Sequence, residues 1–252
     1  MARSSGNRVP ARRGVSGNVI ATVAIVVLAV AVIGGILVFG GDGDGGGDGG
    51  DGGDTAGEIP AELRAGPDSN TLTEAEGDAV TIVEFLDYQC PACAAYYTNV
   101  TKQLEEDYAD RVTFVTRNFP LSMHPLAQPA ARAAEAAAAQ GRYREMYHQL
   151  YDNYQQWAVT EDGQRVSDDE QRATTLFDSY ATEIGLDLDR FHTDLASAEI
   201  QRRIDADVAA GERVGVSSTP TIYVNGEKFE SSAESFDDVA AQLRDQIDEA
   251  LG

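Results

Sequence analysis

The sequence is poor in cysteine. Only Cys90 and Cys93 are present among 252 residues. A framework of several structural disulfides, of the kind that small secreted domains use, is therefore excluded. A zinc site is disfavoured as well, because there is no second Cys-x-x-Cys pair and the three histidines lack paired spacing. A chain with one close-spaced pair and no other thiol is expected to use that pair chemically.

Lysine is also scarce, with only Lys102 and Lys228. The chain has 42 acidic against 19 basic residues, so its formal net charge is −23. Such a surface repels phosphate backbones, which excludes nucleic acid as an expected partner. The acidic, lysine-poor composition fits adaptation to high salt, and it equally fits an ordinary, highly charged soluble domain.

The first 40 residues carry no acidic side chain. Residues 19–39 are apolar apart from Thr22 and small glycines, and at ~1.5 Å per residue this run spans roughly the ~30 Å core of a bilayer. We therefore expect a transmembrane anchor at 18–40. The preceding basic tail, 1–17, should remain in the cytoplasm, which makes the chain a single-pass protein of the cell membrane. The part of the chain that follows the anchor should then lie outside the cytoplasm. The tail's basic residues are Arg3, Arg8, Arg12 and Arg13.

Two other export routes remain open for this segment. A signal peptide cleaved after residues 29–31 would leave an exposed apolar stub at 32–39, so we favour an uncleaved anchor. The pair Arg12-Arg13 fits a twin-arginine signal only in part. Residues 41–78 then form a linker and lead-in, whose Gly/Asp-rich part has nothing to bury and should act as a disordered acidic tether. Calcium binding is an alternative interpretation of its aspartates, but their spacing matches no known calcium-binding loop.

The folded part begins with a pattern typical of parallel strands. Residues 79–86 are β-branched and apolar, residues 92–108 have helical spacing, and residues 112–116 are again β-branched. The order strand, helix, strand predicts a βαβ unit, and we assign residues 79–120 to the first part of one α/β domain.

A long helical stretch then interrupts the strands. Residues 121–212 are expected to form an all-helical insertion, in which Ser167 with Glu170 makes a capping-box pattern and Gly185 ends a helix. The second part of the domain, 213–252, contains a strand at 220–224 and a final helix capped by Ser235. Between them, Asn225-Gly226 is a strong hairpin signal.

The cysteine pair stands at the start of a helix. There the first sulfur can lie over unpaired backbone N–H groups and the positive end of the helix dipole, which favours thiolate. Cys90 is therefore the candidate nucleophile and Cys93, one turn on, the resolving cysteine. Pro91 fits the first helical turn. Zinc bound by the pair with distant histidines and an inert structural disulfide remain as alternatives, although so short a loop stabilises little.

A second motif lies far downstream. A strand ending in Cys-Pro-x-Cys, a helical insertion, then Thr219-Pro220 before a strand resembles the DsbA-like branch of the thioredoxin superfamily. The likeness covers roughly residues 75–252. It implies a thioredoxin fold with a helical insertion and an enzyme, a protein disulfide oxidoreductase, whose redox group is a Cys90–Cys93 disulfide and which needs no metal or organic cofactor.

The resemblance also implies residue roles. Pro220 matches a proline held in the cis form, and Thr219 matches the position whose backbone faces the disulfide and, with Pro91 and Ala92, meets substrate. Glu84 matches a buried carboxylate that assists proton transfer at the buried sulfur; a solvent-facing strand-end glutamate is the alternative. Two further residues, Tyr88 and Gln89, are expected to lie beside the site and to contact substrate, because they directly precede Cys90.

Other residues receive plainer interpretations. The remaining tyrosines recur at helical spacing and are expected mainly to pack the core, although a peptide groove is the alternative. His124 is expected to be an ordinary loop histidine. The best-known oxidases of this family carry a histidine between the cysteines, whereas this chain has Pro91-Ala92, which predicts a less acidic first cysteine and a less oxidising disulfide.

Function follows as an expectation. The chain should donate disulfides to the thiols of exported proteins and be reoxidised by a membrane partner such as a quinone-linked oxidase, its soluble part being monomeric. A membrane-tethered reductase or isomerase using the same site is one alternative. A non-catalytic module that binds peptides or a metal is another.

Overall fold

The computed structural model describes residues 59–64, 66, 69–77 and 80–252. The expected basic tail, anchor and Gly/Asp-rich segment, up to residue 58, lie outside the described residues. Within the described part, no helix combines the length and apolar character needed to cross a membrane.

A mixed sheet forms the centre of the described chain. Its order is β1-β3-β2-β4-β5, with β2 and β3 parallel and every other neighbouring pair antiparallel. The parallel βαβ unit is thus confirmed, as is the hairpin at Asn225-Gly226, where both residues have positive φ (51° and 95°). The strands are β1 Asn70–Thr73, β2 Val80–Leu86, β3 Val112–Asn118, β4 Thr221–Val224 and β5 Glu227–Lys228.

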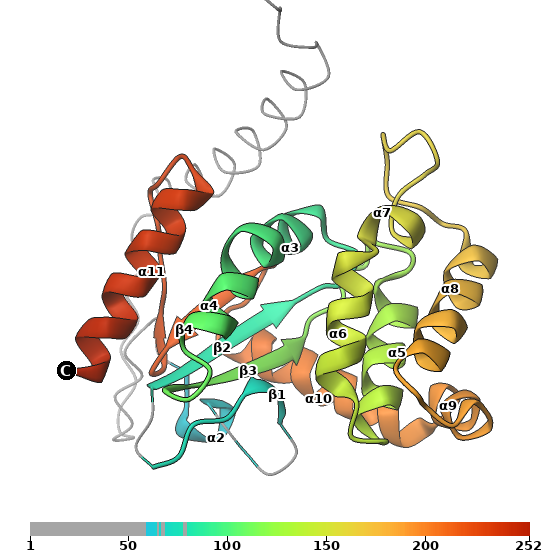
Figure 1. Cartoon of the computed structure of the whole chain (residues 1–252), viewed down its shortest axis with the longest axis horizontal. Helices are drawn as coiled ribbons and strands as arrows, with labels where there is room; N and C mark the ends of the chain where they lie inside the picture. Colours follow the sequence, from blue (N-terminus) through green and yellow to red (C-terminus); the bar gives the residue numbers. More distant parts are fainter. Residues whose placement is uncertain (1–58, 65, 67–68, 78–79) are drawn as a thin grey trace, which may run out of the picture. The chain divides into compact units, whose positions relative to one another are not determined.

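The helices fall into three groups (Figure 1). Between β2 and β3 the chain forms α3 Pro91–Tyr96, a π-helical turn η1 Tyr97–Thr101 and α4 Lys102–Asp107. Between β3 and β4 lie the insertion helices, which gather beside one end of the sheet except for α10, which runs behind it. A short α2, Ala61–Arg64, precedes the sheet and α11, Phe236–Leu251, ends the chain. The insertion comprises α5 Ala127–Ala138, α6 Tyr143–Asp152, α7 Tyr154–Trp157, α8 Glu170–Glu183, α9 Leu188–Leu195 and α10 Ala198–Arg213.

Strand β2 is buried on both faces. Its alternate residues Val83 and Phe85 enter a cluster formed with α2 and α10, whereas Ile82 and Leu86 enter the larger cluster formed with α3, η1, α11 and the insertion. This double burial explains why the strand reads as a continuous apolar run. Each such side chain, fully removed from water, contributes about 1.5–3 kcal/mol to stability. The strand that leads to Cys90 is therefore held firmly on both sides.

Helix α10 packs very closely against the segment that follows β3. A Cβ atom placed on Gly211 would lie 2.8 Å from the ring of Phe119 and 3.1 Å from that of Phe85. Real Cβ atoms do not approach so closely, so only glycine allows the helix to lie here. The contact fixes the chain just after β3, where the loop toward α5 begins.

Several local predictions can be compared directly with the structure. Gly185 has a φ of 78° just after α8, and the Ser235 hydroxyl accepts the Asp238 N–H, as expected. The prediction of a capping box at Ser167 is wrong, because α8 begins at Glu170. Its N-cap is Asp169, whose side chain accepts the N–H of Arg172. Ser167 is buried, and its hydroxyl accepts the Asp169 N–H. Helix α9 lies in the stretch expected to be all-helical, but it was not predicted as a separate helix. Residues 41–78 were expected to be only linker and lead-in, yet α2 and the sheet strand β1 lie there.

Candidate active site

Three chain segments meet at one edge of the sheet. Cys90 follows the carboxyl end of β2, and residues 119–126 follow that of β3; parallel pairing, Leu86 opposite Asn118, places both ends together. Strand β4 runs the other way, Phe85 opposite Thr221, so the segment that precedes it arrives at the same edge. The carboxyl edge of parallel strands is where α/β proteins commonly place their sites.

The two distant motifs are in contact. Cys90 is the N-cap of α3 and Pro91 occupies the first turn, as the sequence predicts. The Cys90 thiol donates a hydrogen bond to the carbonyl oxygen of Thr219, with 3.5 Å between sulfur and oxygen. The Thr219–Pro220 peptide bond is cis. Pro91 and Ala92 are exposed beside the sulfur, whereas Thr219 is buried.

The two sulfurs differ in acidity. A hydrogen bond from the Cys93 side chain is the largest influence on Cys90 and, aided by the Thr219 side chain, lowers the pKa of Cys90 to about 6 against the opposing effect of burial. Cys93 is 0 % exposed, and burial raises its pKa well above the usual value; Cys90 and Glu84 add to the effect. Deprotonation is therefore favoured at Cys90, which forms a thiolate, and disfavoured at Cys93, which remains a thiol.

Glu84 is buried beneath the cysteines, and the solvent-facing alternative is wrong. Only 1 % of the residue is exposed, and it lies on the same face of β2 as Ile82 and Leu86, toward the cluster that includes Cys93. Burial raises the pKa of Glu84 to about 8. Its Oε2 atom accepts no hydrogen bond from the described residues. At neutral pH this carboxyl group is therefore mostly protonated and able to donate.

The structure corrects the expectation for Tyr88 and Gln89, which are 1 % and 0 % exposed and do not reach a substrate. The Tyr88 hydroxyl lies 2.8 Å from that of Tyr143. The Gln89 side chain donates to the carbonyl oxygens of Ala158 and Ser167, and it accepts the N–H of Leu126. Both side chains support the site from inside, Gln89 by tying the insertion to the turn before Cys90.

His124 and Asp87 belong to the site, although the sequence interpretation missed them. The Nδ1 atom of His124 lies 2.6 Å from Oδ2 of Asp87, and the histidine side chain is only 9 % exposed. Asp87 begins the turn that leads to Cys90, and the N–H of Cys90 donates to the Asp87 carbonyl oxygen over 3.0 Å. His124 is therefore not an ordinary loop histidine. The available signal was positional, since one residue follows β2 and the other follows β3.

The tyrosines form a packed aromatic cluster rather than an open groove. The rings of Tyr97 and Tyr151 stack with centroids 5.0 Å apart, and Tyr147 meets Tyr151 edge-on at the same distance. These residues are all buried. The cluster joins η1 to α6 and thereby fastens the insertion to the helix that carries the cysteines.

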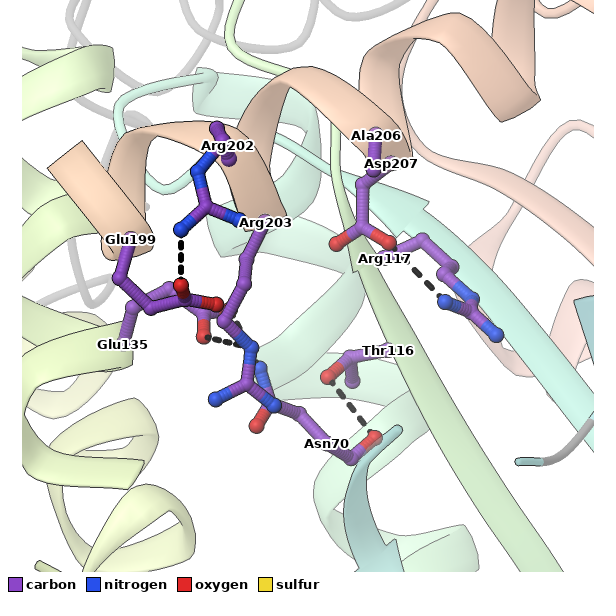
Figure 2. A pocket seen from close by; sticks show the side chains of 9 residues that line it. All are labelled: Asn70, Thr116, Arg117, Glu135, Glu199, Arg202, Arg203, Ala206 and Asp207. Atoms are coloured by element: carbon purple, nitrogen blue, oxygen red, sulfur yellow. Dashed lines mark hydrogen bonds and ion pairs between the residues drawn. The ribbon is translucent and has the colours of Figure 1, made fainter. Parts of the chain in front are cut away.

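A separate polar cavity of about 350 Å³ lies among β1, β3, α5 and α10 (Figure 2). Its lining includes Arg117, which contacts Asp207 at 3.0 Å, and Glu135, which lies 3.7 Å from Arg203. Asn118 also donates to Glu135 at 2.7 Å. Opposite charges thus compensate one another, and the cavity, which neither cysteine lines, joins the insertion to the edge of the sheet.

The fold, the paired sulfurs and their unequal acidity define a thiol–disulfide oxidoreductase. Residues 75–245 match the family model described as Thioredoxin, and the chain belongs to that family. A thioredoxin-like oxidoreductase from Silicibacter pomeroyi is 28 % identical, with a TM-score of 0.58 over 76 % of this chain and 98 % of that one. Oxidised BdbD from Bacillus subtilis shares the fold, with 20 % identity and a TM-score of 0.60 over 78 % of this chain and 97 % of that one.

A curated relative carries a different name. The Na⁺/H⁺ antiporter NhaA 3 of Salinispora tropica is 38 % identical over 173 residues, which are 68 % of this chain. The match covers 24 % of the antiporter, so this chain spans about a quarter of that relative's length.

Proposed function

We propose that this oxidoreductase donates disulfides to exported proteins. The observation that carries the proposal is the asymmetry of the pair: Cys90 stands at the N-terminus of α3 with a lowered pKa, and Cys93 is buried with a raised one. Such a pair has one sulfur that attacks or is attacked and one that resolves.

The reaction balances in two exchanges. A substrate thiolate attacks the Cys90 sulfur of the oxidised pair, a substrate–Cys90 disulfide forms, and the Cys90–Cys93 bond breaks with the electron pair on Cys93. A second substrate thiolate then attacks the substrate sulfur of this mixed disulfide. The substrate becomes a disulfide, Cys90 leaves as a thiolate, and the enzyme is reduced by two electrons.

The low pKa of Cys90 favours this direction. A thiol of low pKa is the better leaving group, and its thiolate stabilises the reduced enzyme. With a pKa of about 6 in place of 9.0, the reduced form at pH 7 gains about tenfold in the exchange equilibrium, or about 1.4 kcal/mol and ~30 mV. Cys90 therefore has a lowered pKa even though no histidine lies between the cysteines.

Glu84 supplies the proton that Cys93 needs. When Cys93 is released, a buried thiolate of raised pKa must be protonated, and a carboxyl group of pKa about 8 is mostly protonated at pH 7. In reoxidation the carboxylate accepts the same proton. Substrate meets the exposed Pro91 and Ala92 and the Thr219 backbone, where an extended chain can pair.

The location and partner rest on the sequence alone. The apolar run 19–39 behind a basic tail supports a single-pass anchor with the catalytic part outside the cytoplasm. An acidic Gly/Asp tether would let that part reach both its substrates and a quinone-linked membrane oxidase. A reporter enzyme that is active only outside the cytoplasm, fused to the C-terminus, tests this topology: activity is expected, and a fusion that is expressed but inactive would refute it.

Redox equilibrium tests the direction. The chain is equilibrated with mixtures of reduced and oxidised glutathione, and the fraction of Cys90–Cys93 disulfide is measured by alkylation and mass. A potential near or above that of glutathione supports a donor. A strongly reducing, thioredoxin-like value supports the reductase alternative and refutes the donor role, while Cys90→Ser serves as the variant that cannot form the pair.

A further inference from the structure

A buried carboxylate, that of Asp87, lies in the turn that leads to the nucleophilic cysteine. The Asp87 side chain is fully buried, and its Oδ1 atom accepts the N–H of Gln89 at 2.7 Å. Its carbonyl oxygen accepts the N–H of Cys90. The carboxylate is thus part of the turn that presents the sulfur, and its negative charge opposes thiolate formation there. A buried charge so placed needs compensation.

The compensating group comes from the loop after β3. His124 contacts Oδ2 of Asp87, and the N–H of Leu121 donates to the same oxygen at 2.9 Å. At the other end of the loop, the N–H of Leu126 donates to the Gln89 side chain at 2.6 Å. The loop that carries His124 is therefore fixed at both of its ends, and it places the imidazole at the edge of the sheet where Cys90 lies.

We propose that His124 is a positioning residue for disulfide exchange: held by Asp87 as an imidazolium, it cancels the buried carboxylate and stabilises the Cys90 thiolate. The inference rests on the proposed nucleophilic role of Cys90. It also assigns Asp87 a role, because without the carboxylate the imidazole would be neither held nor kept charged.

The charges around His124 agree with this role. Burial lowers the pKa of His124, but the hydrogen bond and the charge of Asp87, with a further contribution from Cys90, raise it overall. From α7, Tyr154 faces the same turn; burial raises its pKa, and its hydroxyl donates to the Gln89 carbonyl oxygen. Because its pKa is raised, Cys93 also stays neutral. Asp87 and a Cys90 thiolate are thus the two negative charges that the imidazolium faces.

The arrangement is linked to the redox state. In the reduced enzyme the thiolate and the imidazolium stabilise each other, whereas a Cys90–Cys93 disulfide carries no charge. The pKa of His124 should therefore be higher in the reduced than in the oxidised chain, by an amount equal to the stabilisation that the histidine gives the thiolate.

Substitution tests the inference through the acidity of Cys90, measured as the pH dependence of its alkylation in the full reduced chain. His124→Gln keeps a side chain that can bond Asp87 but removes the charge. It should raise the pKa of Cys90 by about one unit, which at pH 7 lowers the thiolate fraction from about 90 % to about half and the oxidising equilibrium about fivefold. His124→Lys should restore most of the acidity, as should adding Asp87→Asn to His124→Gln.

A matched control is His192→Gln, which removes a surface histidine paired with Asp178 at 2.8 Å and should leave Cys90 unchanged. An unaltered pKa of Cys90 in His124→Gln would overturn the inference. If the wild-type Cys90 itself titrates like a free thiol, the proposed function fails instead. Where His124→Gln does not fold, NMR titration of His124 in the reduced and oxidised wild-type chain decides, and equal pKa values would refute the proposal.

Discussion

Replacing Glu84 with glutamine should stabilise the protein in a pH-dependent manner. Glutamine has nearly the same shape as glutamate but never ionises. In the folded chain the pKa of Glu84 is raised to about 8, compared with 4.5 for the free group. Between these values the unfolded chain releases a proton that the folded chain keeps, so the wild-type stability falls as pH rises through this window. The stability is fully present only below the lower value.

The magnitude follows from the two pKa values. At about 1.36 kcal/mol per pKa unit, the burial of Glu84 costs the wild type about 3 kcal/mol at pH 7 and less than about 1 kcal/mol at pH 5. The stability advantage of Glu84→Gln over the wild type should therefore grow by about 2.5 kcal/mol between these pH values. A purely structural effect of the amide would shift stability equally at both.

Urea unfolding of the two reduced proteins at several pH values measures this difference. Glu249→Gln, at an exposed position in α11, provides the matched control and should show no growing advantage. The same Glu84 variant should exchange disulfides more slowly, because Cys93 loses its proton donor. A stability difference that stays constant or shrinks as pH rises would refute the burial of an ionisable carboxyl group beside the cysteines.

Three further outcomes are expected. Cys93→Ala should retain substrates as mixed disulfides on Cys90, seen as adducts on non-reducing gels, and Cys90→Ser should retain none; adducts that survive the serine substitution would place the nucleophile elsewhere. Gly211→Ala should lower the free energy of unfolding by about 1–3 kcal/mol because its methyl group meets the Phe119 ring, and a neutral effect in urea unfolding would contradict the close packing. Gln89→Leu should lower the free energy of unfolding by about 2–3 kcal/mol, since three buried backbone groups of the insertion lose their partner. An unchanged free energy of unfolding would show that these three hydrogen bonds are dispensable.

The parallel strands and the cysteine helix were predictable because their signals are local. Strand β2 is buried on both sides and so carries an unbroken apolar run, and Pro91 after Cys90 marks a helix start. Strand β1 escaped prediction because it is only four residues long, NTLT, and half of it is only partly buried. An edge strand of this kind forms through its partner, β3, rather than through its own pattern.

Tertiary contacts explain the other failures. Ser167 looks like a helix cap, but its carbonyl oxygen is used by the buried Gln89, and the helix starts after Asp169 instead. Gln89 and Tyr88 directly precede the nucleophile, yet the turn directs both side chains inward. The pairing of Asp87 with His124 joins residues 37 positions apart. It could have been anticipated only by combining two facts, that the strands are parallel and that each residue follows one of them.

The acidity of Cys90 tests the account most directly. The reduced chain is reacted with iodoacetamide across a range of pH, and the modified cysteine is identified by mass. Reaction at Cys90 alone, with a midpoint near pH 6, is predicted. A midpoint near 9.0, the value of an unperturbed thiol, or equal reaction of Cys93, would contradict it.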